Sequence, residues 1–70
     1  MTKLPQVSHD RVVRALKRAG FYILREGNHI SLTDDKHLVI VPRHHVIKPG
    51  TLKQILEAAD ISTDRFKELL

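Results

Sequence analysis

Cysteine and tryptophan are absent from this sequence, and other aromatic residues are scarce: the 70 residues include one tyrosine and two phenylalanines. Without cysteine the chain forms no disulfide, and it cannot hold a thiolate zinc site or a thiol redox centre. With so few aromatic rings, the core has to come from aliphatic side chains. Seventy residues leave room for only one domain, over residues 1–70, and a domain this small buries only about 60% of its unfolded surface, so its stability is marginal.

Long apolar runs are missing as well. No stretch approaches the ~20 consecutive apolar residues that a membrane-spanning helix needs. The N-terminus lacks the apolar segment of a signal peptide, because Lys3 is followed by Pro5 and polar residues. These absences predict a cytoplasmic protein with no membrane association.

Basic residues outnumber acidic ones. The chain has 12 Lys and Arg against 8 Asp and Glu, which gives a formal net charge of +4. The excess lies in residues 1–56, which hold ten basic and four acidic side chains, whereas residues 57–70 hold two basic and four acidic ones. A basic body with an acidic C-terminal part suits either a polyanion such as RNA or an acidic protein partner.

Two segments have the apolar spacing of amphipathic helices. After an extended lead-in over residues 1–7, Ser8 is a suitable N-cap for a helix over residues 8–19, and Gly20 fits its end. The buried stripe of this helix consists of Val12, Ala15, Leu16 and Ala19. A second helix is predicted over residues 49–59, where Pro49 suits the first turn; its stripe consists of Leu52, Ile55, Leu56 and Ala59. Ser62 can cap a last short helix whose apolar residues are Phe66, Leu69 and Leu70.

Three short strands are predicted between the helices, over residues 21–26, 28–33 and 37–42. Gly27-Asn28 predicts a tight reversal because both residues tolerate positive φ, and Asp34-Asp35-Lys36 predicts a second turn. Connections this short favour an antiparallel meander. Each helix has one apolar stripe to bury, so both helices are expected on the same face of the sheet, with the other face open. This is an α+β fold of order α-β-β-β-α with a short C-terminal helix. Its predicted core includes Leu16, Ile30, Leu32, Ile40, Leu52 and Leu56.

The candidate for proton-transfer chemistry is His29. Strand alternation places it on the face opposite Ile30 and Leu32, directly after the Gly27-Asn28 reversal, and Arg25 precedes the same reversal. An imidazole can accept or donate a proton during RNA cleavage through the 2′-hydroxyl, provided that cations meet the charged phosphate. The spacing alone favours an ordinary exposed histidine on a sheet over a catalytic one.

The other histidines give weaker signals. We expect His9 and His37 to be surface residues. His44 and His45 are adjacent, so in an extended segment their side chains point in opposite directions, and no nearby carboxylate completes a metal site. We therefore predict no metal and no cofactor, and we assign His44 to phosphate contact or loop structure beside Arg43. The predicted RNA-binding residues are Arg11, Arg14, Lys17, Arg18, Arg25, Asn28, Arg43, His44, Lys48 and Lys53.

An ordered set of short motifs resembles the HicA family of mRNA interferase toxins. The motifs are Gly20-Phe21, Gly27-Asn28-His29, Val41-Pro42-Arg43-His44, and Lys48-Pro49-Gly50-Thr51-Leu52 followed by Ile55-Leu56, and the resemblance runs from about Leu4 to Leu70. It implies the fold of double-stranded-RNA-binding domains and a toxin that cuts single-stranded mRNA without a metal. It also implies a HicB-type antitoxin as partner. The family's catalytic histidine follows a Gly-Ser pair, so its position here is His29, with Asn28 in place of the serine.

Two alternatives stay open at this stage. The same fold also serves non-catalytic RNA-binding modules, which read A-form RNA by its shape. A protein-interaction domain, whose basic face meets an acidic partner, would show the same charge pattern. In each case we expect the chain to be monomeric on its own.

Overall fold

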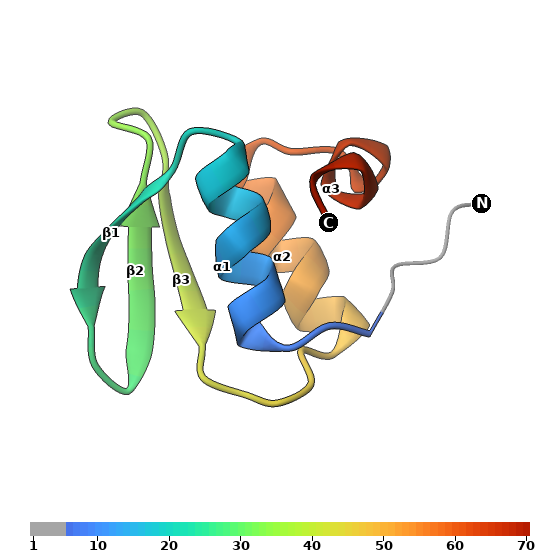
Figure 1. Ribbon diagram of the computed structural model, residues 1–70, viewed down its shortest axis with the longest axis horizontal. Coiled ribbons are helices and arrows are strands. Elements are labelled where there is room, and N and C mark those ends of the chain that lie inside the picture. Colours follow the sequence, from blue (N-terminus) through green and yellow to red (C-terminus); the bar gives the residue numbers. More distant parts are fainter. Residues whose placement is uncertain (1–5) are drawn as a thin grey trace.

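The computed structural model describes residues 6–70 (Figure 1). The elements in chain order are α1 (His9–Arg18), β1 (Tyr22–Glu26), β2 (His29–Thr33), β3 (Leu38–Pro42), α2 (Pro49–Ala59) and α3 (Thr63–Leu69). This order confirms the predicted α+β fold, and each strand begins one residue later than expected. Most of the predicted lead-in lies outside the described residues. No helix within residues 6–70 is long and apolar enough to cross a membrane.

The three strands form one antiparallel sheet in the order β1-β2-β3. Ile30 pairs with Val41 and Leu32 pairs with Val39, and all four side chains are buried. Because side chains alternate along a strand, the residues between these four point to the other face. Both α1 and α2 lie on one side of the sheet and contact β3 (Figure 1). The prediction of helices on one face is confirmed, and the second face is open.

The core joins the covered face of the sheet to the apolar stripes of the helices. The predicted core positions that are buried are Leu16, Ile30, Leu32, Leu52 and Leu56. The prediction that Ile40 is buried is wrong, because its side chain is 48% exposed. The register pairs Ile40 with Ser31 on the open face, and the fully buried residues of β3 are its neighbours Val39 and Val41. Ala19, the last residue of the predicted α1 stripe, is only partly buried.

Three backbone positions have positive φ within residues 6–70: Gly20 at 99°, Asp35 at 76° and Asp60 at 56°. Gly20 thus ends α1 as predicted. The reversal between β1 and β2 is present, but its expected cause is wrong, since neither Gly27 nor Asn28 has positive φ. The turn is stabilised instead by hydrogen bonds to Gly27, whose N–H donates to the carbonyl of His29 at 3.0 Å.

Helix α3 is fastened to α1 by a cation. Nη1 of Arg18 donates to the carbonyl oxygens of Leu69 and Leu70, at 2.7 and 3.1 Å. These carbonyls belong to the last turn of α3, where helix geometry leaves acceptors without intrahelical partners. The two predicted N-caps are confirmed: Ser8 Oγ accepts from the N–H of Arg11, and Ser62 Oγ accepts from the N–H of Arg65.

Candidate functional site

His29 is the first residue of β2, and its exposed side chain lies on the open face of the sheet. Its partner across the ladder is Pro42, the last residue of β3. Arg25 of β1 pairs with Ser31, which has the same orientation as His29, so Arg25 shares the open face. The expectation that His29 faces solvent is confirmed. This end of the sheet brings together the β1–β2 turn, the start of β2 and the exit of β3.

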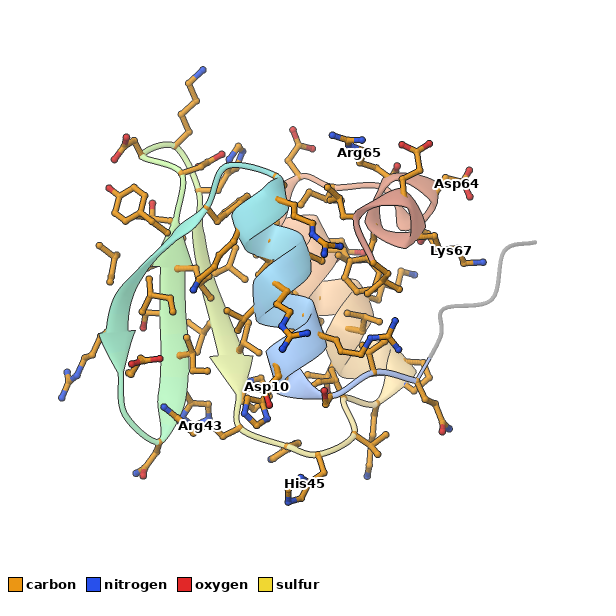
Figure 2. The ribbon with its side chains drawn as sticks, viewed as in Figure 1. Asp10, Arg43, His45, Asp64, Arg65 and Lys67 are labelled. Carbon is orange, nitrogen blue, oxygen red and sulfur yellow. The ribbon has the colours of Figure 1, made fainter. Side chains whose placement is uncertain are left out.

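Arg43 links the exit of β3 to the turn that precedes His29. Its Nε donates to the carbonyl oxygen of Gly27 at 2.7 Å, across 16 residues of sequence. Figure 2 shows Arg43 beside this turn. None of the ion pairs between the described residues includes Arg43. Its Nη groups therefore remain available for an anion such as a phosphate.

The loop after Arg43 is tied to the N-terminus of α1. The backbone N–H of His9 and its ring Nδ1 both contact the carbonyl oxygen of His44, at 3.1 and 3.0 Å. His9 was expected at the surface, yet its side chain is only 15% exposed because it packs under this loop. Further along, the N–H of Ile47 donates to the carbonyl of Val7 at 2.7 Å. Figure 2 shows His45 projecting outward from the loop.

The predicted RNA-binding residues divide into two groups of four and a separate pair. One group surrounds the end of the sheet at His29: Arg25, Asn28, Arg43 and His44. The second group lies on α1, which covers the opposite face of the sheet: Arg11, Arg14, Lys17 and Arg18. Three of these, Arg11, Arg14 and Arg18, line a cavity of about 170 Å³ beside the end of α3. Lys48 and Lys53 are exposed at the start of α2.

An exposed imidazole and a guanidinium at the same end of a sheet can together act on a phosphodiester. The imidazole can exchange a proton with a substrate, and the guanidinium can stabilise negative charge that develops on a phosphate. Within residues 6–70 no three His, Asp or Glu side chains lie close enough together to hold a metal ion. The sequence pointed to His29 and Arg43 separately, but no sequence signal showed that Arg43 would contact Gly27.

A family model described as the HicA toxin of bacterial toxin-antitoxin matches residues 10–61. The matched range runs from α1 to just beyond α2 and includes the turn, His29 and the loop that carries Arg43. No curated protein matches the chain.

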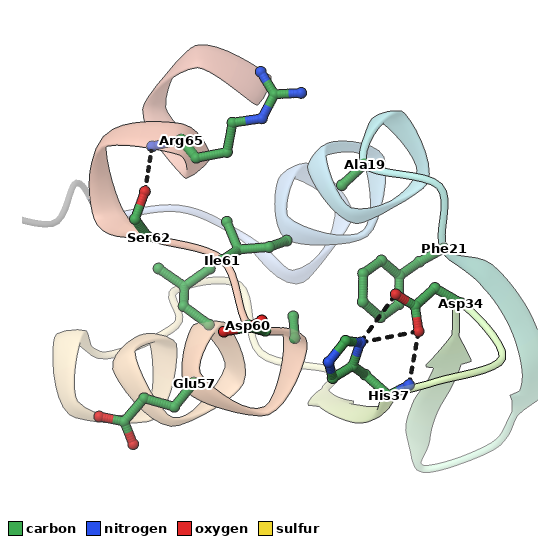
Figure 3. Close-up of a pocket in the computed structure, with 11 residues that line it drawn as sticks. Ala19, Phe21, Asp34, His37, Glu57, Asp60, Ile61, Ser62 and Arg65 are labelled. Atoms are coloured by element: carbon green, nitrogen blue, oxygen red, sulfur yellow. Dashed lines mark hydrogen bonds and ion pairs between the residues drawn. The ribbon is translucent and has the colours of Figure 1, made fainter.

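A second polar cluster lies at the far end of the sheet, around the β2–β3 turn (Figure 3). His37, also expected at the surface, is partly buried there, and its Nδ1 lies 3.0 Å from Oδ2 of Asp34. Asp34 Oδ1 also accepts from the backbone N–H groups of Lys36 and His37. The hydrogen bond from the His37 ring is the main cause that lowers the pKa of Asp34 from 3.8 to about 2.

The Asp34–His37 pair borders an open cavity of about 750 Å³. Phe21 and Leu56 are among its apolar lining residues, and Asp60 and Arg65 are among its polar ones. Every hydrogen bond described above for Asp34 runs within the turn itself. We therefore interpret the pair as a structural clasp of the β2–β3 turn. The turn was predicted from its sequence, whereas the role of His37 was missed.

The low pKa of Asp34 predicts how the clasp responds to acid. A carboxyl whose pKa is depressed in the folded state adds stability above its ordinary pKa of 3.8, and this contribution is lost as pH falls through about 2. We expect Asp34→Asn to lower Tm at pH 6 and the difference from wild type to shrink as pH approaches 2. Thermal unfolding followed by circular dichroism at pH 6, 4 and 2 measures the difference in Tm between the two proteins. The exposed Glu57→Gln serves as the control for charge, and an Asp34→Asn difference that is independent of pH would contradict the interpretation.

Proposed function

Because this chain belongs to the HicA toxin family of bacterial toxin–antitoxin systems, we propose that it is an endoribonuclease that cuts mRNA with His29 as general acid or base. The observation that carries this proposal is the exposed imidazole of His29 on the open face, across the ladder from the strand that leads into Arg43. We propose that the fold acts as one domain and that cleavage needs no metal.

The proposed reaction is attack by a ribose 2′-hydroxyl on the adjacent phosphorus. The O2′–P bond forms and the P–O5′ bond breaks, which leaves a 2′,3′-cyclic phosphate and a 5′-hydroxyl. His29 either takes the proton of the 2′-hydroxyl, in which case water protonates the departing O5′, or gives a proton to O5′, in which case water takes the proton of the 2′-hydroxyl. The Nη groups of Arg43 meet the negative charge that grows on the phosphate oxygens. The acid and base roles both need an imidazole that RNA can reach, and the open face supplies this access.

Membership of a toxin–antitoxin family implies an antitoxin partner, and we propose that it is of the HicB type. The open face offers apolar surface for such a partner, because Tyr22, Leu38 and Ile40 are each about half exposed there (46%, 59% and 48%). Leu38 and Ile40 occupy the same face as His29 by the register of β2 and β3. A protein that buries these side chains would also cover His29.

Removal of the imidazole tests the catalytic assignment. We expect His29→Ala to keep the fold, since the ring lies outside the core, and to slow RNA cleavage by roughly 10²–10⁴-fold, the usual contribution of a positioned acid or base. Cleavage of a defined single-stranded RNA, in the presence of a chelator and across pH 5–8, measures the effect. Circular dichroism and native gel shifts verify folding and RNA binding.

A folded His29→Ala protein that cuts RNA at the wild-type rate would end the catalytic proposal. Failure of the wild type to cut any RNA would direct attention to Asn28, which stands where the family resemblance implies a serine. The Asn28→Ser variant then decides whether that position limits activity. If neither protein cleaves, a non-catalytic RNA-binding domain becomes the better description.

Because the basic residues near His29 and those on α1 lie on opposite faces of the sheet, we expect their substitution to affect the salt dependence of RNA affinity differently. On an oligonucleotide of a few nucleotides, we expect Arg25→Gln to reduce the log–log slope of affinity against salt by about 0.7, the value for one single-strand phosphate contact. The matched variant Arg14→Gln, on the helix that covers the other face, should leave the slope unchanged. Fluorescence anisotropy at several salt concentrations gives both slopes. Equal losses in the two variants would show that the short RNA reaches α1.

A shared face predicts competition between RNA and antitoxin. We expect a HicB-type antitoxin to displace RNA from His29→Ala, a variant that binds RNA without consuming it. Ile40→Asp should weaken the antitoxin more than the RNA, because it places a charge in the apolar part of the face. Anisotropy of labelled RNA during antitoxin titration measures displacement. A ternary complex in which the two ligands bind without weakening each other would disprove the shared face.

A further inference from the structure

His9 makes two contacts with a single acceptor. As the first residue of α1, it has a backbone N–H that no preceding helical carbonyl can satisfy, and this N–H donates to the carbonyl of His44 at 3.1 Å. Its ring Nδ1 lies 3.0 Å from the same oxygen. A carbonyl only accepts hydrogen bonds, so Nδ1 carries the hydrogen. His44 is thereby fixed to the start of the helix from two directions.

The fixed carbonyl belongs to the residue directly after Arg43. The N–H of His44 donates to the carbonyl of Pro42 at 2.9 Å, so the backbone on both sides of Arg43 is constrained. From this position Nε of Arg43 reaches the carbonyl of Gly27 at 2.7 Å. Pro42 is also the ladder partner of His29. A continuous set of contacts therefore runs from His9 through His44 and Arg43 to the turn before His29.

We propose that His9 is a positioning residue for the end of the sheet that carries His29. By fixing the carbonyl of His44, it holds Arg43 against Gly27, and this contact sets the position of the Arg43 guanidinium relative to the His29 imidazole. This inference rests on the proposed function for its catalytic consequence. Proton transfer and phosphate stabilisation both need close, aligned groups, and a misplacement of about 1 Å can cost up to about 10²-fold in rate. Asp10, 3.3 Å from the outer side of the His9 ring, is an exposed partner of little energetic weight.

Three substitutions at position 9 remove the contacts stepwise. His9→Asn keeps the backbone N–H and places an amide donor near the position of Nδ1. His9→Leu keeps the backbone donor and loses the ring donor. His9→Pro loses both donors, yet proline suits the first position of a helix, and the extended backbone of Ser8 (φ −79°, ψ 163°) suits a residue before proline. The matched control is His37→Leu, which removes an Nδ1 hydrogen bond at the far end of the sheet.

The first measurement does not depend on activity. In ¹⁵N-edited NMR spectra, we expect the Arg43 Nε–H to be protected from solvent exchange in the wild type, in His9→Asn and in His37→Leu. Protection should fall in His9→Leu and fall further in His9→Pro, while circular dichroism shows all variants folded. Unchanged protection in His9→Pro would overturn the proposal, whatever the protein does to RNA.

The second measurement separates kcat from KM on a single-stranded RNA. Because the backbone contact survives in His9→Leu, we expect kcat to fall about tenfold there and up to about 10²-fold in His9→Pro, with a smaller change in KM and with rescue in His9→Asn. His37→Leu should keep the wild-type kcat below its melting temperature. A wild-type kcat in folded His9→Pro would overturn the positioning role. A wild type that cleaves nothing would refute the proposed function instead, and the exchange of Arg43 would still decide whether His9 holds the loop.

Discussion

One constraint organises this small molecule: its sheet has a single covered face. The apolar pairs Ile30–Val41 and Leu32–Val39 are buried under the helices, and each such side chain contributes roughly 1.5–3 kcal/mol when it leaves water. Since alternation along a strand is strict, burial of Ile30 and Leu32 assigns His29 to the open face. A slip of one residue in β2 would bury His29 and expose both apolar residues. The free energy of the core therefore enforces the accessibility of His29.

The structure also depends on how the two turns that flank β2 are stabilised. The β1–β2 turn contains the residue types of a glycine-dependent reversal, but Gly27 and Asn28 keep negative φ, and the turn is held by hydrogen bonds at Gly27. One of these comes from Arg43, so the side chain that we propose for phosphate binding also stabilises the turn. The Asp34–His37 clasp performs the corresponding task at the other end of β2. Both ends of this strand thus depend on side chains rather than on backbone preference alone.

Local patterns in the sequence were sufficient to predict the helices, the strands and the exposure of His29. Amphipathic spacing, helix caps and strand alternation each depend on only a few neighbouring residues. The α2 bounds, both serine caps and the covered face of β2 followed from such patterns. The prediction for Ile40 failed because every central residue of β3 is apolar. The sequence therefore does not show whether Ile40 or its neighbours Val39 and Val41 face the core. The contacts of His9 and Arg43 could not be predicted, since each joins segments far apart in sequence and depends on how the loop packs against α1.

The fold shows how the charged side chains are distributed, which the net charge alone does not. The net charge of +4 does not form one basic patch: part of it lies on α1, where Arg18 already serves α3, and part surrounds His29. Asp34, Glu57 and Asp60, in contrast, border one cavity at the far end of the sheet. Arg65 lines the same cavity, so these carboxylates already lie near a cation, whereas Arg25 and Arg43 at the His29 end have no ion-pair partner among the described residues and can attract a polyanion. If the proposed RNA substrate binds at the His29 end, the cations that attract its phosphates are therefore at the same end of the sheet as the exposed imidazole.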